Sequence, residues 1–228
     1  ENQASQGSLD NLEKLLDGDS PVNLAFAQAD ALQHYLNKNP DSEGRVELLE
    51  NIGQECVFIV TDVGSELYTG KDLQTATDLR LGIASESSGI AVTYEYMVSQ
   101  VPELANVEVV YGDTSASMGS MGGPDARLDA IMVVHRPREL SAEVEEALSN
   151  PGRFRFLELS DERLTRELPN GTTVYRSMNL AMPGPNEPVK TICVRGLLLA
   201  NKQKLTAQQR DQLTDLVSYH WMEVYATP

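Results

Sequence analysis

The sequence predicts an α/β protein of two lobes, and three observations support this. Segments with apolar residues at helical spacing alternate with short apolar strands along most of the chain, as in layered α/β folds. A stretch with three prolines in ten residues, 179–188, reads as a connector. With 228 residues, of which 41% are hydrophobic, the chain is long enough to bury a sizeable core. The lobes are expected at 1–65 together with 184–228, and at 66–183.

Each element follows from its apolar period and its end signals. Helices are expected where apolar residues recur at helical spacing between start and stop signals, from 8 or 10 to 16, at 29–36, 72–76 and 90–100, from 114 or 115 onward, and at 141–148, 160–168 and 206–225. Strands are expected in short apolar runs, at 22–27, 46–52, 55–61, 78–84, 107–110, 128–134, 154–157, 174–178 and 189–200. Gly53 and Gln54 are expected to separate the second strand from the third.

The acidic composition excludes some partners. Thirty-four acidic and eighteen basic side chains give a formal net charge of −16. Such a charge repels polyphosphates and anionic bilayer surfaces, so we expect no nucleic-acid partner and no direct membrane insertion. The apolar runs are far shorter than a membrane span, and residues 1–8 do not have the order of a signal peptide.

Catalytic motifs are missing, so the sequence predicts a protein that is not an enzyme and has no cofactor. Gly64 to Lys71 resembles a phosphate-binding loop only in its last two residues, because its glycines are wrongly spaced and Asp72 stands where a Ser or Thr would be needed. No serine lies in a Gly-x-Ser-x-Gly elbow. The three histidines are isolated and form no zinc motif, and no metal site is expected.

Two helix starts remain as candidates for ligand binding. The predicted strand at 78–84 runs into Ser85, Ser87, Ser88 and Gly89, where the next helix opens. Unpaired N–H groups and the helix dipole favour an anion at such a start, although Ser and Gly there also serve as ordinary caps. A similar arrangement, with Thr114 and Ser115, follows the strand at 107–110. If both starts open at one sheet edge, they form a small-ligand pocket.

The two cysteines, Cys56 and Cys193, each lie within an apolar run that reads as a strand. They are too few for a disulfide scaffold or a thiolate metal site. Two interpretations stay open: a pair of buried thiols, or a bridge between neighbouring strands in an oxidising compartment.

Several segments, in order, resemble a known family, the TAXI receptors, which are the extracytoplasmic solute receptors of TRAP transporters. The stretches Gly7 to Leu12 and Val22 to Asp30 resemble the family pattern GS-x-x-NL…G-x-AD-[IL]-[AG]-[IF]-x-Q-x-D. Three further stretches resemble its Gly-Ser loop, its [IV]-DA-x-[FV] strand and its passage into the returning strand, at 80–89, 128–134 and 175–194.

The resemblance implies a type II periplasmic-binding-protein fold with a ligand cleft between two α/β lobes. It implies a periplasmic or otherwise extracytoplasmic protein, its signal peptide removed, that captures a small organic anion or amino acid for the permease subunits of a TRAP-type transporter. The family's first strand, helix and second strand should precede Gly7, so the first lobe is expected to be incomplete. Ile90 replaces the family's Thr, and no Tyr follows Gly184, which departs from the usual carboxylate site. The family topology also implies a disulfide between Cys56 and Cys193.

Together, residues and resemblance predict a set of ligand-binding side chains: Gln28, Ser85, Ser87, Ser88, Gly89, Thr114, Ser115, Arg136 and Tyr175. Two alternatives to a transport receptor stay open. One is a ligand-sensing or protein-interaction domain with the same fold. The other is a binding protein for an apolar, lipid-like ligand, which would contact the predicted cleft residues Met118, Met121, Met178 and Met182.

Overall fold

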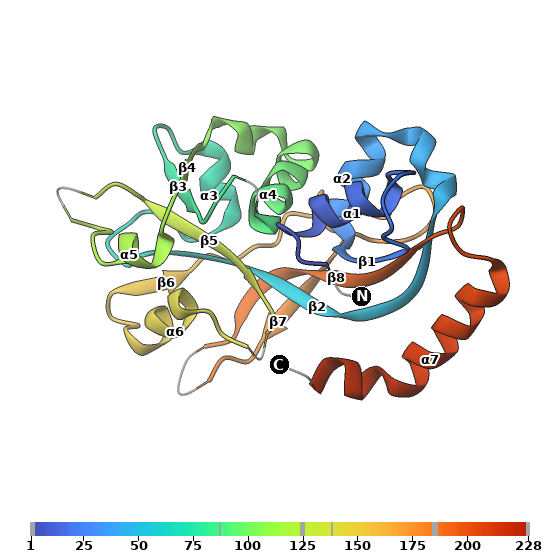
Figure 1. The fold of residues 1–228 in the computed structure, drawn as a ribbon. Coiled ribbons are helices and arrows are strands. Elements are labelled where there is room, and N and C mark those ends of the chain that lie inside the picture. Colours follow the sequence, from blue (N-terminus) through green and yellow to red (C-terminus); the bar gives the residue numbers. More distant parts are fainter. Residues whose placement is uncertain (1–2, 87, 124–125, 138, 184–186, 227–228) are drawn as a thin grey trace. The chain divides into compact units, whose positions relative to one another are not determined.

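The computed structural model describes residues 3–86, 88–123, 126–137, 139–183 and 187–226, the last seven of these by their backbone alone. Helices and strands alternate, so the prediction of an α/β fold is confirmed (Figure 1). The chain divides into two compact units, Glu1–Gln54 with Arg195–Pro228, and Glu55–Val194. The units change over at Gln54 and Val194, whereas the lobes were expected to change over at 65 and 183. No helix in the described part is long and apolar enough to cross a membrane.

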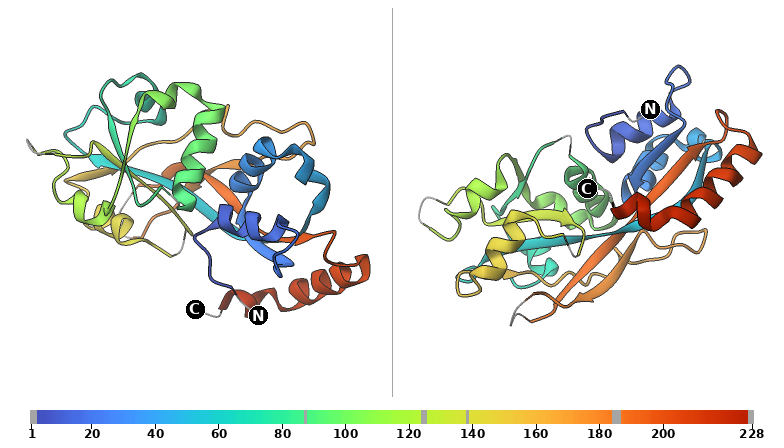
Figure 2. Two further views of the ribbon diagram at one scale, coloured as in Figure 1. Left: turned by 45° about the horizontal axis from the view of Figure 1, so that its top comes forward. Right: turned by 60° about the horizontal axis from the view of Figure 1, so that its bottom comes forward.

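Unit 1 is a three-stranded sheet with helices on both faces. Its strands are β1 (Leu24–Gln28), the second half of β8 (Val189–Asn201) and the first half of β2 (Val46–Asp62), in the order β1-β8-β2. Helices α1 (Ser8–Leu16) and α2 (Ala29–Lys38) lie over one face, and α7 (Ala207–Ala226) lies along the other (Figure 2). A short 3-10 helix, Pro40–Arg45, joins α2 to β2.

Apolar side chains hold these layers of unit 1 together. From α1, Leu12 and Leu15 are fully buried. On the opposite face, Leu213 and Val217 of α7 pack against a small cluster that contains Leu198. Leu216, between them on the same helix, is 55% exposed.

The prediction of two strands at 46–52 and 55–61 is wrong, because a single strand, β2, runs from Val46 to Asp62. Gly53 has a φ of 128°, which glycine adopts without steric cost. This local change lets the strand continue through the Gly-Gln pair that was expected to end it. As a result β2, like β8, contributes one half to each unit.

Unit 2 contains a parallel core of β5 (Ala130–His135), β3 (Arg80–Ile83) and β4 (Glu108–Tyr111), in that order. The second half of β2 pairs antiparallel with β5, and β6 (Phe154–Phe156) and β7 (Tyr175–Leu180) pair with β2 and β8. The helices of this unit are α3 (Gly70–Thr75), α4 (Gly89–Gln100), the 3-10 helix Pro102–Asn106, α5 (Thr114–Met118) and α6 (Ala142–Ser149). Figure 1 shows α3 and α4 on one side of the sheet and α5 and α6 on the other.

The methionines that an apolar, lipid-like ligand would contact belong to the core of unit 2. Met118 and Met121 are 2% and 3% exposed and pack with Val60, Ile131 and Phe154. Met182 is buried in a second cluster, and Met178 packs against that cluster. Methionine fills irregular gaps in cores well, and these side chains therefore give no support to an apolar ligand site.

A disulfide joins Cys56 of β2 to Cys193 of β8. The two strands are neighbours in the sheet, and both cysteines are buried in the cluster that contains Phe58 and Val133. Both also fall within unit 2, so the bridge lies inside one compact unit and closes a loop across a sequence separation of 137.

The helix predicted at 160–168 is absent, and this part of the chain forms consecutive turns. Asp161 explains the difference, because its carboxylate accepts the backbone N–H of Arg163 at 2.9 Å. Such a local side-chain bond satisfies the backbone in a turn and competes with the helix. The Arg163 side chain then reaches Glu103 and Gln74, which ties these turns to the rest of unit 2.

Candidate functional site

The three parallel strands of unit 2 run toward one edge of the sheet, where β3 and β4 end level with each other and β5 continues to His135. The register sets Ile83 of β3 opposite Tyr111 of β4, and Gly82 of β3 opposite Ile131 of β5. The segments that follow these strands therefore open at the same carboxyl edge, where open α/β sheets bind ligands. Ser85, Ser88, Gly89, Thr114, Ser115 and Arg136 are the predicted residues that follow these strands, and we call the accessible groups at this edge the carboxyl-edge site. The starts of α4 and α5 therefore share one sheet edge, and the small-ligand pocket expected between them stays a prediction.

The first helix start, that of α4, is built by Ser88. Its hydroxyl donates to the Ser85 carbonyl at 2.6 Å and accepts the N–H of Ala91 at 3.2 Å, which is an N-cap bond. The Ser88 side chain is thus committed to the backbone. Within the described residues, the N–H groups of Gly89 and Ile90 have no acceptor, so a ligand at α4 would meet main-chain donors rather than the serine hydroxyl.

The second helix start is α5, and its cap is Asp113 rather than Thr114 or Ser115. The Asp113 carboxylate accepts the N–H of Ala116 at 2.9 Å. Thr114 is buried and donates its hydroxyl to Oε1 of Glu143 at 2.7 Å, whereas Ser115 is exposed. Of the two predicted donors, only the Ser115 hydroxyl is accessible at this edge.

Arg136 follows β5 and supplies the positive charge of the carboxyl-edge site. Its guanidinium pairs with Oε1 of Glu139 at 3.2 Å, and the side chains are 42% and 62% exposed. A pair so exposed contributes little to stability, and a guanidinium that is 42% exposed is accessible to a ligand. The guanidinium could therefore bind a carboxylate or phosphate group of a ligand.

Negative groups also lie near this edge. Burial raises the pKa of the Tyr111 hydroxyl, and the nearby carboxylates of Glu86 and Glu95 raise it further. The carboxyl-edge site therefore does not attract every anion. An anionic ligand would depend on contacts with the α4 start and Arg136, and the carboxylates would suit a ligand that also carries an amino group.

Three further residues were predicted for the site. Gln28, which is buried at the end of β1, belongs to unit 1. Ser87 lies outside the described residues. Tyr175 is fully buried: its hydroxyl donates to the Thr93 carbonyl at 3.4 Å and its ring lies 5.8 Å from that of Tyr96. The family pattern placed Tyr175 near a ligand, but this side chain packs in the core.

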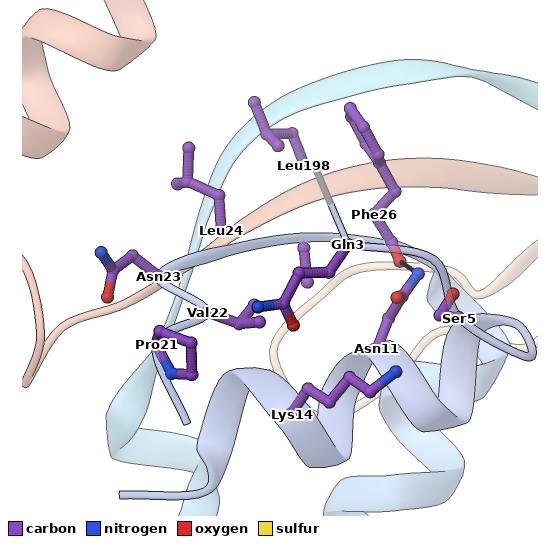
Figure 3. Close-up of a pocket in the computed structure, with 11 residues that line it drawn as sticks. Gln3, Ser5, Asn11, Lys14, Pro21, Val22, Asn23, Leu24, Phe26 and Leu198 are labelled. Atoms are coloured by element: carbon purple, nitrogen blue, oxygen red, sulfur yellow. Dashed lines mark hydrogen bonds between the residues drawn. The ribbon is translucent and has the colours of Figure 1, made fainter. Parts of the chain in front are cut away.

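Sequence reasoning missed a pocket in unit 1, at the outer edge of β1. It has a volume of about 570 Å³, and its walls come from the N-terminal segment, α1, β1 and β8 (Figure 3). Its lining combines polar side chains such as Asn11, Lys14 and Asn23 with apolar ones such as Phe26 and Leu198. One signal of it is visible in the sequence: the strand has large apolar residues only at alternate positions, Leu24 and Phe26.

A second pocket, of about 380 Å³, lies in unit 2. Three of its charged side chains already have partners, since Lys190 pairs with Glu158 at 2.7 Å and the Arg155 guanidinium lies 3.9 Å from the centre of the Tyr68 ring. Because these charges are satisfied within the unit, this pocket offers a ligand less than the carboxyl-edge site does.

No family model matches the sequence, and no curated protein matches it. Several solved structures are similar to the chain. The substrate-binding protein of an amino acid ABC transporter is 11% identical, with a TM-score of 0.48, over 97% of this chain and 73% of that one. Lactococcal OpuAC, closed on glycine betaine, is 11% identical, with a TM-score of 0.47, over 93% and 70%. A Xanthomonas citri protein bound to ATP is 9% identical, with a TM-score of 0.48, over 86% and 63%. Similarity at this level concerns only the path of the backbone and identifies no ligand.

Proposed function

We propose that the protein is an extracytoplasmic solute-binding protein that captures a small organic anion or amino acid and delivers it to a membrane transporter. The observation that carries the proposal is that β3, β4 and β5 run toward one edge of the sheet in unit 2, with main-chain donors at α4 and a guanidinium after β5. Sites of this kind bind small ligands, and binding alone requires no catalytic residues.

The chemistry of the carboxyl-edge site defines the ligand class. The N–H groups of Gly89 and Ile90, together with Arg136, suit a carboxylate. Glu86 and Glu95 suit an ammonium group next to it. An amino acid carries both groups, and a simple dicarboxylate carries only the first, so the two kinds of ligand are distinguishable by affinity.

The transporter partner follows from the sequence resemblance alone. The TAXI-like segments favour the permease subunits of a TRAP-type transporter and a periplasmic or otherwise extracytoplasmic location. The disulfide between two buried cysteines is consistent with an oxidising compartment.

Titration calorimetry with L-glutamate, L-alanine and succinate tests the ligand class. We expect at least one of the three to bind and to raise the melting temperature. Arg136→Gln should weaken that binding about tenfold, because a charge-assisted hydrogen bond is lost. The matched control is Glu139→Gln, which removes the carboxylate that competes for the same guanidinium and should leave the affinity unchanged or improve it.

Two results would overturn the proposal. One is that none of the three compounds binds and the melting temperature is constant. The other is that a compound binds with equal affinity to the Arg136→Gln and Glu139→Gln variants, since the carboxyl-edge site would then not hold the carboxylate.

A further inference from the structure

The outer edge of β1 is the exposed end of the sheet of unit 1. β1 stands last in the strand order, with β8 as its one neighbour among the described strands. In an antiparallel ladder, alternate residues turn their N–H and C=O groups toward the neighbour and away from it. Asn23 accepts the N–H of Asn201 next to β8, so Ala25 and Ala27 face the ladder and Leu24, Phe26 and Gln28 face outward.

Two of these outward groups already have partners. The Phe26 carbonyl accepts Nδ2 of Asn11 at 2.8 Å, and the Gln28 N–H donates to the hydroxyl of Ser8 at 3.1 Å. Both contacts come from α1, which therefore caps one half of the edge. Within the described part of the chain, the N–H and C=O of Leu24 and the N–H of Phe26 have no such partner. These groups span about 7 Å of extended backbone, enough to pair with roughly three residues of another strand.

The pocket lies along this open half of the edge (Figure 3). The Phe26 side chain borders it and is 50% exposed, while its cross-strand partner Leu198 is 5% exposed. Phe26 therefore presents an aromatic surface next to unpaired main-chain groups. A free edge of this kind is a template for a further strand unless it is blocked.

The polar lining favours a main-chain ligand over an anion. The ammonium group of Lys14 is held by the Asp10 carboxylate at 2.8 Å and the Ala4 carbonyl at 3.1 Å. The remaining polar side chains around the pocket, including Asn11 and Asn23, are neutral. Hydrogen-bonding groups without a free charge suit the amides of an extended peptide.

The net charge of the chain decides which kind of polypeptide can add a strand to this edge. Pairing with a second copy of this chain would bring together two molecules of charge −16 each, and the repulsion opposes it. A neutral or basic segment of another polypeptide does not meet this repulsion. We propose that the open half of the β1 edge, at Leu24 and Phe26, binds an extended, neutral or basic peptide segment that pairs with β1 as an added strand and places an apolar side chain against Phe26.

The probe for this proposal is the blocked hexapeptide acetyl-Lys-Val-Thr-Val-Thr-Lys-amide, which has apolar residues at alternate positions and basic ends. Amide hydrogen exchange of the full chain, followed by NMR, reports on each backbone group. We expect the peptide to slow exchange at the Leu24 and Phe26 amides and to leave the Ala25 and Ala27 amides unchanged, since these already bond to β8. The same peptide N-methylated at its valines and threonines should produce no protection.

Variants separate main-chain pairing from apolar contact. Leu24→Pro removes the outward N–H and should abolish binding, while Leu24→Val keeps that N–H and should bind with little change. Phe26→Ala should weaken binding about fivefold through lost apolar contact. Leu216→Ala, at a side chain of α7 that is 55% exposed, is its matched control.

The proposal is overturned if millimolar peptide gives no protection, or if the N-methylated peptide protects as well as the parent does. It is also overturned if Leu24→Pro, shown to be folded by its protected β8 amides, binds the peptide as Leu24→Val does. None of these outcomes depends on the carboxyl-edge site in unit 2, so this proposal and the solute-binding proposal stand or fall separately.

Discussion

The hydroxyl of Thr114 donates to Oε1 of Glu143 at 2.7 Å and so joins the first residue of α5 to α6. The sequence suggested Thr114 as a ligand donor, but in the structure this buried hydroxyl holds two helices of unit 2 together. The difference separates a stabilising residue from a binding one, and it can be measured.

Thr114→Val should lower the free energy of unfolding by about 1 kcal/mol, because the hydrogen bond to the carboxylate is lost while the side-chain volume is kept. Affinity for any ligand of the carboxyl-edge site should not change. Chemical denaturation and calorimetry measure the two effects. Ser115→Ala, at the exposed neighbour, is the control and should leave stability within error. If Thr114→Val lowers the ligand affinity and leaves the stability unchanged, the prediction is wrong and Thr114 is a binding residue.

Reduction of the Cys56–Cys193 disulfide should destabilise unit 2 by about 2 to 5 kcal/mol, since the bridge closes a long loop in the unfolded chain. A thiol assay on the denatured, unreduced protein should find no free thiol. Thermal melting with and without a phosphine reductant measures the stability change. The Cys56→Ala, Cys193→Ala double variant should melt at the same temperature in both buffers. Two free thiols in the unreduced protein would contradict the bridge.

Asp161 should make stability depend on acid pH. The hydrogen bond from the Arg163 guanidinium is the main cause that lowers the pKa of this carboxyl well below its usual value of 3.8. A lowered folded-state pKa means that the ionised form stabilises the fold above about pH 4, and that this contribution is lost as the pH falls through the folded pKa.

Asp161→Asn should therefore melt lower than the parent at pH 7, by an amount that corresponds to about 1 kcal/mol for a partly exposed ion pair. The difference should shrink as the pH falls below 4. Melting temperatures measured from pH 2 to pH 8 provide the test, with Glu139→Gln as a control at a more exposed ion pair. A constant gap between variant and parent over this range would exclude the ionised carboxylate as its cause.

Gly122→Ala should destabilise the fold by about 1 to 3 kcal/mol. Gly122 has a φ of 74°, and a Cβ there would lie 2.3 Å from Cγ of Asp62, whose carboxylate accepts the N–H of Gly64. Gly119→Ala is the matched control three residues earlier, because its Cβ would meet one backbone oxygen at 3.9 Å. Equal denaturation midpoints for the two variants would show that the Asp62 side chain moves away without cost.

The sequence predicted where α4 and α5 begin, but it predicted only in part which side chains cap them. Ser88 stands before α4 and caps it, as its residue type favours. At α5 the cap is Asp113, one residue before the two that the sequence suggested. Asp and Ser cap helices similarly well, so residue type does not decide between Asp113 and Ser115, and the backbone path into α5 does. Arg136 was placed correctly after its strand, because the apolar run that ends in Val134 is unambiguous.

The apolar and polar pattern of the sequence determined the alternation of helices and strands, and with it the α/β class, since these periods are set within a few residues. It did not determine that β2 runs unbroken through Gly53, that Tyr175 turns into the core, or that Phe26 stays half exposed. Those outcomes depend on strands paired across long separations: β1 meets β8, and Cys56 meets Cys193, only when distant parts of the chain come together. Local propensity carries no information about such partners, and the tertiary structure alone decided which side chains are buried by them and which remain available to bind.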